Sequence, residues 1–150
     1  MLILKVIAAA ALAVAIVIAV IVFSAPIQRN SGGIPDVKFT EFAPDRTDIR
    51  VGESSKILFN VQNLEMRPII DAQVIIIIEP SSYQPYLTIQ NQTTELPDLN
   101  AKDARTGQMQ VVVSAVSAPA KEALYTVKGV LFVEGKQSDV RQFEFRVRQE

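Results

Sequence analysis

The chain has 150 residues, with 15 Lys and Arg against 16 Asp and Glu, and contains no Cys, no His and no Trp. The missing Cys and His exclude disulfides, Cys and His catalysis, zinc–thiolate sites and blue-copper sites. Without Lys5 and Arg29, 13 basic residues remain against 16 acidic ones, a net charge of −3. The chain therefore lacks the clustered basic excess that nucleic-acid binding requires.

The first feature along the chain is an uninterrupted apolar run at residues 6–23, made of Val, Ile, Leu, Ala and Phe. As a helix this run would span about 27 Å, close to the ~30 Å hydrocarbon core of a bilayer. A cleaved signal peptide is the alternative, but its apolar region is normally only about 7–15 residues long. A cut after Ala25 would also place Phe23 at position −3 and Pro26 just beyond. We therefore expect a retained single-pass transmembrane anchor helix at residues 1–24.

Residues 25–36 follow as a linker, because their Pro and Gly residues disfavour regular structure. Lys5 and the α-amino group favour a cytoplasmic N-terminus, since positive charge is retained on the inner side. We expect residues 6–23 to contact membrane lipid and residues 30–150 to be extracytoplasmic.

Residues 37–150 predict one all-β domain, an antiparallel β-sandwich of seven or eight strands. Apolar and polar residues alternate with a period of two, the pattern of strands with one buried face. This pattern covers residues 37–40, 48–51, 56–62, 87–90, 108–115, 125–133 and 142–148. Residues 74–78 are continuously apolar and predict a central strand with both faces covered. Residues 134–137 predict a hairpin loop of about four residues.

The order of residues 51–53, 57–63, 74–80 and 125–127 resembles the immunoglobulin-like modules of prokaryotic surface proteins. It is similar to the cell-adhesion-related and S-layer-associated domains of archaea. The resemblance implies that Tyr125 fills the tyrosine-corner position near the start of strand F and that Val127 stands where antibody domains place their second Cys. The disulfide and core Trp of antibody domains are absent.

The general plan also resembles the archaellum stator-type proteins of archaea, which pair one N-terminal membrane helix with one β-sandwich domain. In that family the sandwich contacts the surface layer. The likeness lies in the order of an apolar helix and a β-sandwich, without a shared motif.

The sequence offers no catalytic group of side chains. Ser54 and Ser55 have no His as a base, and Lys56 is expected to point outward on its strand. The acids near residues 41–48 and 95–103 lack the spacing of a known calcium loop. We therefore expect no enzymatic activity, no cofactor and no metal site.

Candidate modification and interface residues are few. Asn91 opens a glycosylation sequon, Asn91-Gln92-Thr93, and exposed Tyr and Met side chains are candidates for protein contacts. An arginine row near the C-terminus predicts either a solvated strand face or contact with an acidic partner. The candidate interface residues are Met66, Tyr83, Tyr86, Arg141, Arg146 and Arg148.

Two functions remain open from the sequence. The first is a membrane-anchored extracytoplasmic structural or interaction protein of the cell envelope, which docks another envelope or membrane-complex component. The second is a ligand- or ion-binding accessory subunit of a membrane enzyme or transporter. A pocket with converging polar groups would favour the second, and a flat surface would favour the first.

Overall fold

The computed structural model describes residues 33–149. The expected anchor helix at residues 1–24 and residues 25–32 of the linker lie outside them. Over the described part, no helix is both long and apolar enough to cross a membrane. The elements are β1 (Val37–Pro44), β2 (Asp48–Arg50), β3 (Ser54–Asn63), β4 (Ala72–Glu79), the 3₁₀ helix η1 (Ser81–Tyr86), β5 (Leu87–Gln90), β6 (Thr93–Glu95), β7 (Met109–Ala115), β8 (Glu122–Val133) and β9 (Lys136–Arg148).

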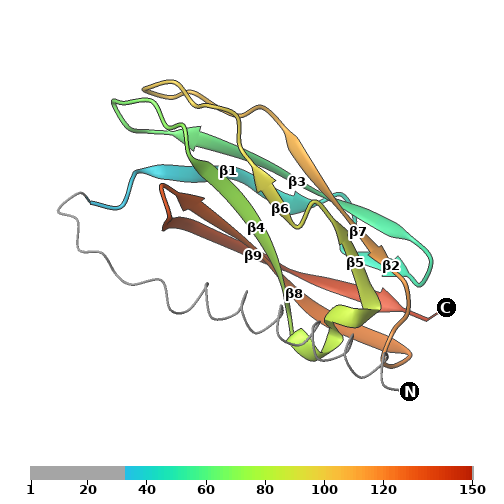
Figure 1. Cartoon of the computed structure of the whole chain (residues 1–150). Coiled ribbons are helices and arrows are strands. Elements are labelled where there is room, and N and C mark those ends of the chain that lie inside the picture. The colour runs from blue at the N-terminus through green and yellow to red at the C-terminus, as the bar shows by residue number, and fades with distance from the viewer. Residues whose placement is uncertain (1–32, 150) are drawn as a thin grey trace, which may run out of the picture. The chain divides into compact units, whose positions relative to one another are not determined.

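The strands form two sheets, which confirms the all-β sandwich (Figure 1). One sheet has the order β1-β3-β7-β5 and the other the order β2-β9-β8-β4-β6. The expected seven or eight strands become nine within residues 33–149, because β6 is only three residues long and too short to show alternation.

One pairing departs from the expected antiparallel arrangement: β2 is parallel to β9. β1 is antiparallel to β3 in the four-stranded sheet. After a three-residue turn the chain continues as β2 at the edge of the other sheet. β1 already runs alongside β9 in the same sense, since Val37, Phe39 and Phe42 contact Ser138, Asp139 and Phe143 in turn, and β2 continues in that direction.

The core lies between the inner faces of the two sheets. Ile57, Phe59 and Val61 of β3 alternate with partly or fully exposed neighbours and are almost completely buried. Burial of such a side chain contributes about 1.5–3 kcal/mol. Tyr125 and Val127 of β8 are also buried, and Tyr125 is the fourth residue of the strand; its role as a tyrosine corner stays a prediction.

β4 was expected to be covered on both faces, and that expectation is wrong in part. The strand does lie between β8 and β6. Val74, Ile76 and Ile78 are buried, whereas Ile75 and Ile77 are only half-buried. The reason is that Ile75 and Ile77 point away from the other sheet, and no further layer covers them among the described residues.

The β8–β9 hairpin has a two-residue loop, not the expected four. Val133 pairs with Lys136, which leaves Glu134 and Gly135 between the strands. Both have positive φ, 51° and 74°. This is the backbone of a type I′ turn, whose twist matches that of the paired strands.

Gly129 makes room for a ring from the opposite sheet. A bulge in β1, between Phe39 and Glu41, shifts the alternation so that Phe42 turns toward the core. The Phe42 ring packs against Phe39 and Phe143, with centroids 5.3 and 5.5 Å apart. A Cβ on residue 129 would lie 2.6 Å from Cζ of Phe42. The Phe42 ring therefore fills the space that a side chain at residue 129 would occupy.

We expect Gly129→Ala to lower the free energy of unfolding by about 1–3 kcal/mol, because Phe42 must leave its two ring contacts to admit the methyl group. Thermal unfolding followed by circular dichroism measures the loss. In a Phe42→Ala background the same substitution should cost little. An equal loss in both backgrounds would contradict the close packing of residue 129 against the ring.

Candidate interaction surfaces

Strand register defines two ends of the sandwich. At one end Val37 pairs with Asn63, and this is where the described chain begins. At the other end Ser54 pairs with Ser114. We call the first the entry end and the second the far end. In Figure 1 the start of β1 and the β8–β9 turn lie toward the left at the entry end.

Asn63 is the buried centre of the entry end. Its side-chain nitrogen lies 2.9 Å from the carbonyl oxygens of Arg67 and Asn100 and 3.4 Å from that of Leu99. Its side-chain oxygen accepts a 2.9 Å hydrogen bond from the Glu65 amide. The side chain is fully buried. One amide thus joins the loop after β3 to the loop after β6.

Charged groups extend this network. The Arg67 guanidinium donates two hydrogen bonds to the Glu134 carboxylate, at 2.5 and 2.8 Å, and joins the loop after β3 to the β8–β9 turn. The pair raises the pKa of Arg67 and lowers that of Glu134. Glu65 accepts a hydrogen bond from the Asp36 amide at 2.6 Å. The loops at this end are therefore held by side chains as well as by backbone.

Met66, a predicted interface residue, lies at the entry end and is 78% exposed. It stands between the two residues, Glu65 and Arg67, whose side chains hold the loop in place. The loop is fixed while the Met side chain points into solvent.

The predicted arginine row does not form one face. Arg146 and Arg148 lie on the outer face of the five-stranded sheet, since they pair with Leu124 and Glu122 of β8. Arg141 pairs with Gly129, whose position faces inward, and lies on the opposite side of β9 beside β1. Successive residues of a strand alternate in direction, so an odd and an even position cannot share a face.

The two outward arginines belong to a network of ion pairs. The Nε of Arg146 lies 3.2 Å from Oε1 of Glu122. The Nη2 of Arg148 lies 2.6 Å from Oδ2 of Asp48. All four side chains are about half exposed, so each pair contributes about 0–1 kcal/mol to stability.

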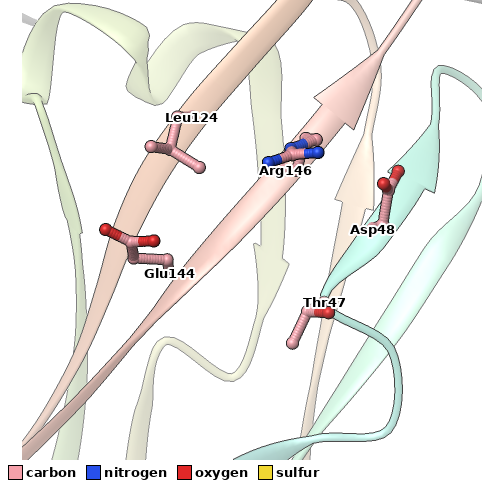
Figure 2. A pocket seen from close by; sticks show the side chains of 5 residues that line it. All are labelled: Thr47, Asp48, Leu124, Glu144 and Arg146. Carbon is pink, nitrogen blue, oxygen red and sulfur yellow. The ribbon is translucent and has the colours of Figure 1, made fainter.

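Beside this network the outer face is hollowed into a shallow depression of about 320 Å³. It is lined by Thr47, Asp48, Leu124, Glu144 and Arg146. Figure 2 shows the Arg146 side chain between Leu124 of β8 and Asp48 of β2. Leu124 is 48% exposed, an apolar group surrounded by charge.

Leu124, Asp48 and Asn63 are site residues that the sequence reasoning missed. Leu124 had a signal, because it is apolar at a position whose neighbours Ala123 and Tyr125 face the core. Asn63 had no such signal in the sequence, because Asn at the end of a strand is an ordinary turn residue. Its role depends on the carbonyls of Leu99 and Asn100, which only the fold brings next to it.

The other candidates lie elsewhere. Tyr83 and Tyr86 lie in η1, which follows β4 at the far end. Tyr86 is half-buried, and its carbonyl accepts hydrogen bonds from the amides of Val116 and Ser117. Met66 and the tyrosines are therefore at opposite ends and belong to different surfaces.

Asn91 is exposed in the turn between β5 and β6, with φ of 57°. Asn tolerates this left-handed conformation better than most residues, so the turn itself explains its presence. Its exposure leaves it accessible, and its glycosylation stays a prediction.

The serines considered for catalysis have structural roles. Ser55 is buried, with Oγ 2.7 Å from Oδ1 of Asp45 and 2.8 Å from the carbonyl oxygen of Arg46. The hydrogen bonds from Ser55 and from the Lys56 amide lower the pKa of Asp45. Together they fix the turn between β1 and β2. Across residues 33–149, no three acidic side chains gather as ligands for a metal ion.

Comparison with known proteins gives a fold and no family. No protein-family model and no curated protein matches the sequence. The CARDB domain of a Pyrococcus furiosus protein is similar in structure, with a TM-score of 0.53 and 13% identity over 79% of this chain and 100% of that domain.

Two further solved structures are similar. AvmM, which catalyses macrocyclization in alchivemycin A biosynthesis, has a TM-score of 0.53 and 8% identity over 77% of this chain and 90% of its own. Escherichia coli alpha-2-macroglobulin has a TM-score of 0.51 and 14% identity, over 78% of this chain and 7% of its own. These similarities show an immunoglobulin-like β-sandwich fold. Because one of the similar proteins, AvmM, is an enzyme, similarity in fold does not assign a function.

We expect Asn63→Ala to lower the free energy of unfolding by about 1–3 kcal/mol, because it leaves buried carbonyls without a donor. Thermal unfolding of the full chain in detergent measures the loss. Asn100→Ala is the matched control, since Asn100 is exposed and contributes its backbone carbonyl to the network. A loss of similar size in both variants would contradict the role of the Asn63 side chain.

Proposed function

We propose that this chain is a membrane-anchored, extracytoplasmic interaction protein of the cell envelope. The apolar run at residues 6–23 supports an anchor, because its length suits the hydrocarbon core of a bilayer. The immunoglobulin-like sandwich that follows is a domain type that binds through its faces and end loops. The partner is a protein of the envelope or of a membrane complex.

The depression beside Leu124 is the observation that supports our choice of binding surface. Leu124 offers exposed apolar area, and Arg146 offers a planar cation of the kind that is enriched in protein interfaces. Asp48 and Glu144 supply a polar rim with acceptors. An apolar centre within a charged rim is the usual anatomy of a protein-binding patch.

The ion pairs next to the depression suit binding better than stability. Arg146–Glu122 and Arg148–Asp48 are both about half exposed, and they hold the side chains in place. Because such pairs contribute little to stability, a partner that rearranges them loses little free energy. A shallow hollow fits a protruding side chain of a protein, whereas a small-molecule site normally encloses its ligand. This geometry favours a protein partner over the ligand- or ion-binding accessory role.

The proposed orientation predicts that trypsin added to intact cells removes the sandwich. Lys102, in a loop at the entry end, and Lys121, in the loop before β8 at the far end, offer exposed cleavage sites. Immunoblotting of a tag at the C-terminus reports the cleavage, and a cytoplasmic protein that stays intact is the control. Survival of the tag in intact cells, with cleavage after lysis, would refute an extracytoplasmic domain.

We predict that Leu124→Glu weakens partner recovery at least about tenfold, because loss of a central apolar contact costs about 2 kcal/mol or more at an interface. The full chain, tagged after residue 150, is extracted in mild detergent and the copurifying proteins are quantified by mass spectrometry. Leu124 points away from the core, so the melting temperature should not change.

Val116→Glu is the matched control for this experiment. Val116 is an aliphatic residue, 62% exposed, that follows β7 of the other sheet at the far end. Recovery should equal that of the unmodified chain. Equal recovery with Leu124→Glu as well would remove the depression as the binding surface, and recovery of no partner with any variant would favour the accessory ligand-binding role.

A further inference from the structure

Exposed apolar side chains concentrate at the entry end. Over residues 33–149, seven large apolar side chains are exposed, and four of them lie here. They are Ile34 at 66%, Leu64 at 38%, Met66 at 78% and Ile70 at 74%. We call these four the entry-end apolar cluster. Single exposed apolar residues are ordinary, but a concentration at one end marks a contact surface.

The fold holds these side chains outward. Leu64 donates its amide to the Asp36 carbonyl at 2.9 Å, which ties the loop after β3 to the chain next to Ile34. Ile69, beside Ile70, is buried and pairs with Leu99 in both directions at 2.8 and 2.9 Å. The neighbouring residues are thus anchored, and the apolar side chains cannot collapse onto the core without breaking these bonds.

The chain's own connectivity indicates what covers the cluster. The apolar run ends at residue 23, and residues 24–33 reach at most about 35 Å when fully extended. They join the sandwich directly at Ile34, a member of the cluster. If residues 6–23 span the bilayer, the entry end is the part of the domain that this tether keeps nearest to the lipid surface.

We propose that the entry-end apolar cluster inserts into the surface of the lipid bilayer in which the chain is anchored. This inference rests on the proposed membrane anchoring. The apolar face of an interfacial amphipathic helix enters the boundary between headgroups and acyl chains to a depth of about 5–10 Å, and burial of apolar area drives exposed loop side chains into the same region. The tether supplies a high local concentration, so a weak contact suffices.

The charges at this end determine which lipid the contact needs. Arg67 is paired with Glu134, and Asp36 is paired with Lys38 at 2.8 Å. Lys102, Arg105 and Lys136 also lie at this end, but Glu65, Asp71, Asp98 and Asp103 outnumber them. There is no basic excess here to attract anionic headgroups, so the insertion is driven by apolar area and occurs on zwitterionic phosphatidylcholine.

The absence of Cys from the chain makes a direct test possible. Met66→Cys, Ile70→Cys and Val116→Cys are each made in the full chain and labelled with an environment-sensitive fluorophore. The proteins are reconstituted into phosphatidylcholine vesicles with and without nitroxide-labelled phosphatidylcholine. Val116 is the matched control, because it is equally apolar and 62% exposed but lies at the far end.

Labels at residues 66 and 70 should shift to the blue and be quenched at least about twofold more than the label at residue 116, as expected for a shallow insertion of that depth. Adding Met66→Glu should reduce the quenching of a label at residue 70. A change of salt concentration should leave the quenching unchanged, since no basic patch drives it.

Flotation of the same vesicles separates the two proposals. If the chain floats with the vesicles but labels at residues 66 and 70 are quenched no more than the label at residue 116, the anchor stands and insertion of the cluster is refuted. If the chain does not float, membrane anchoring is refuted, and the insertion proposal falls with it.

Discussion

The strands of this sandwich bury mainly one face each, because two sheets pack against each other and the described chain provides no third layer; Val130 of β8, flanked by Ile75 and Val140, is the outward side chain that is still buried. That constraint determines which side chains reach the surface. Tyr125 and Val127 of β8 face inward and are buried, whereas Leu124 of the same strand faces outward and is half exposed. The depression beside Arg146 exists because outward positions of β2, β8 and β9 come side by side in the sheet.

Alternation predicted the strands well because it reports the same one-sided burial. It failed where burial does not follow that rule. β6 has three residues and shows no period, and its place beside β4 depends on a crossing between sheets that no local pattern encodes. The run at residues 74–78 suggested two covered faces, but Ile75 and Ile77 remain half-buried in an outer face. A β-branched run records strand propensity as well as burial.

The candidate site was less predictable than the fold, for a physical reason. Arg146 and Arg148 could be placed on one face by parity, and the same parity separates Arg141 from them. Leu124 could be found as an apolar residue at an outward position. The entry-end network could not, because Asn63 also meets the carbonyls of Leu99 and Asn100, which are distant from it in sequence and have no pattern of their own.

The two proposed contacts lie far apart, and the distance matters for how they would act together. From Lys136 at the β8–β9 turn, β9 runs ten residues to Arg146, a length of about 33 Å. A sandwich resting on its entry end would hold the depression about that far from the lipid, beyond the headgroups and within reach of an envelope protein. A domain that tilts freely would lose rotational freedom each time it bound the partner. Contact with the membrane would remove part of that entropic cost before the partner arrives.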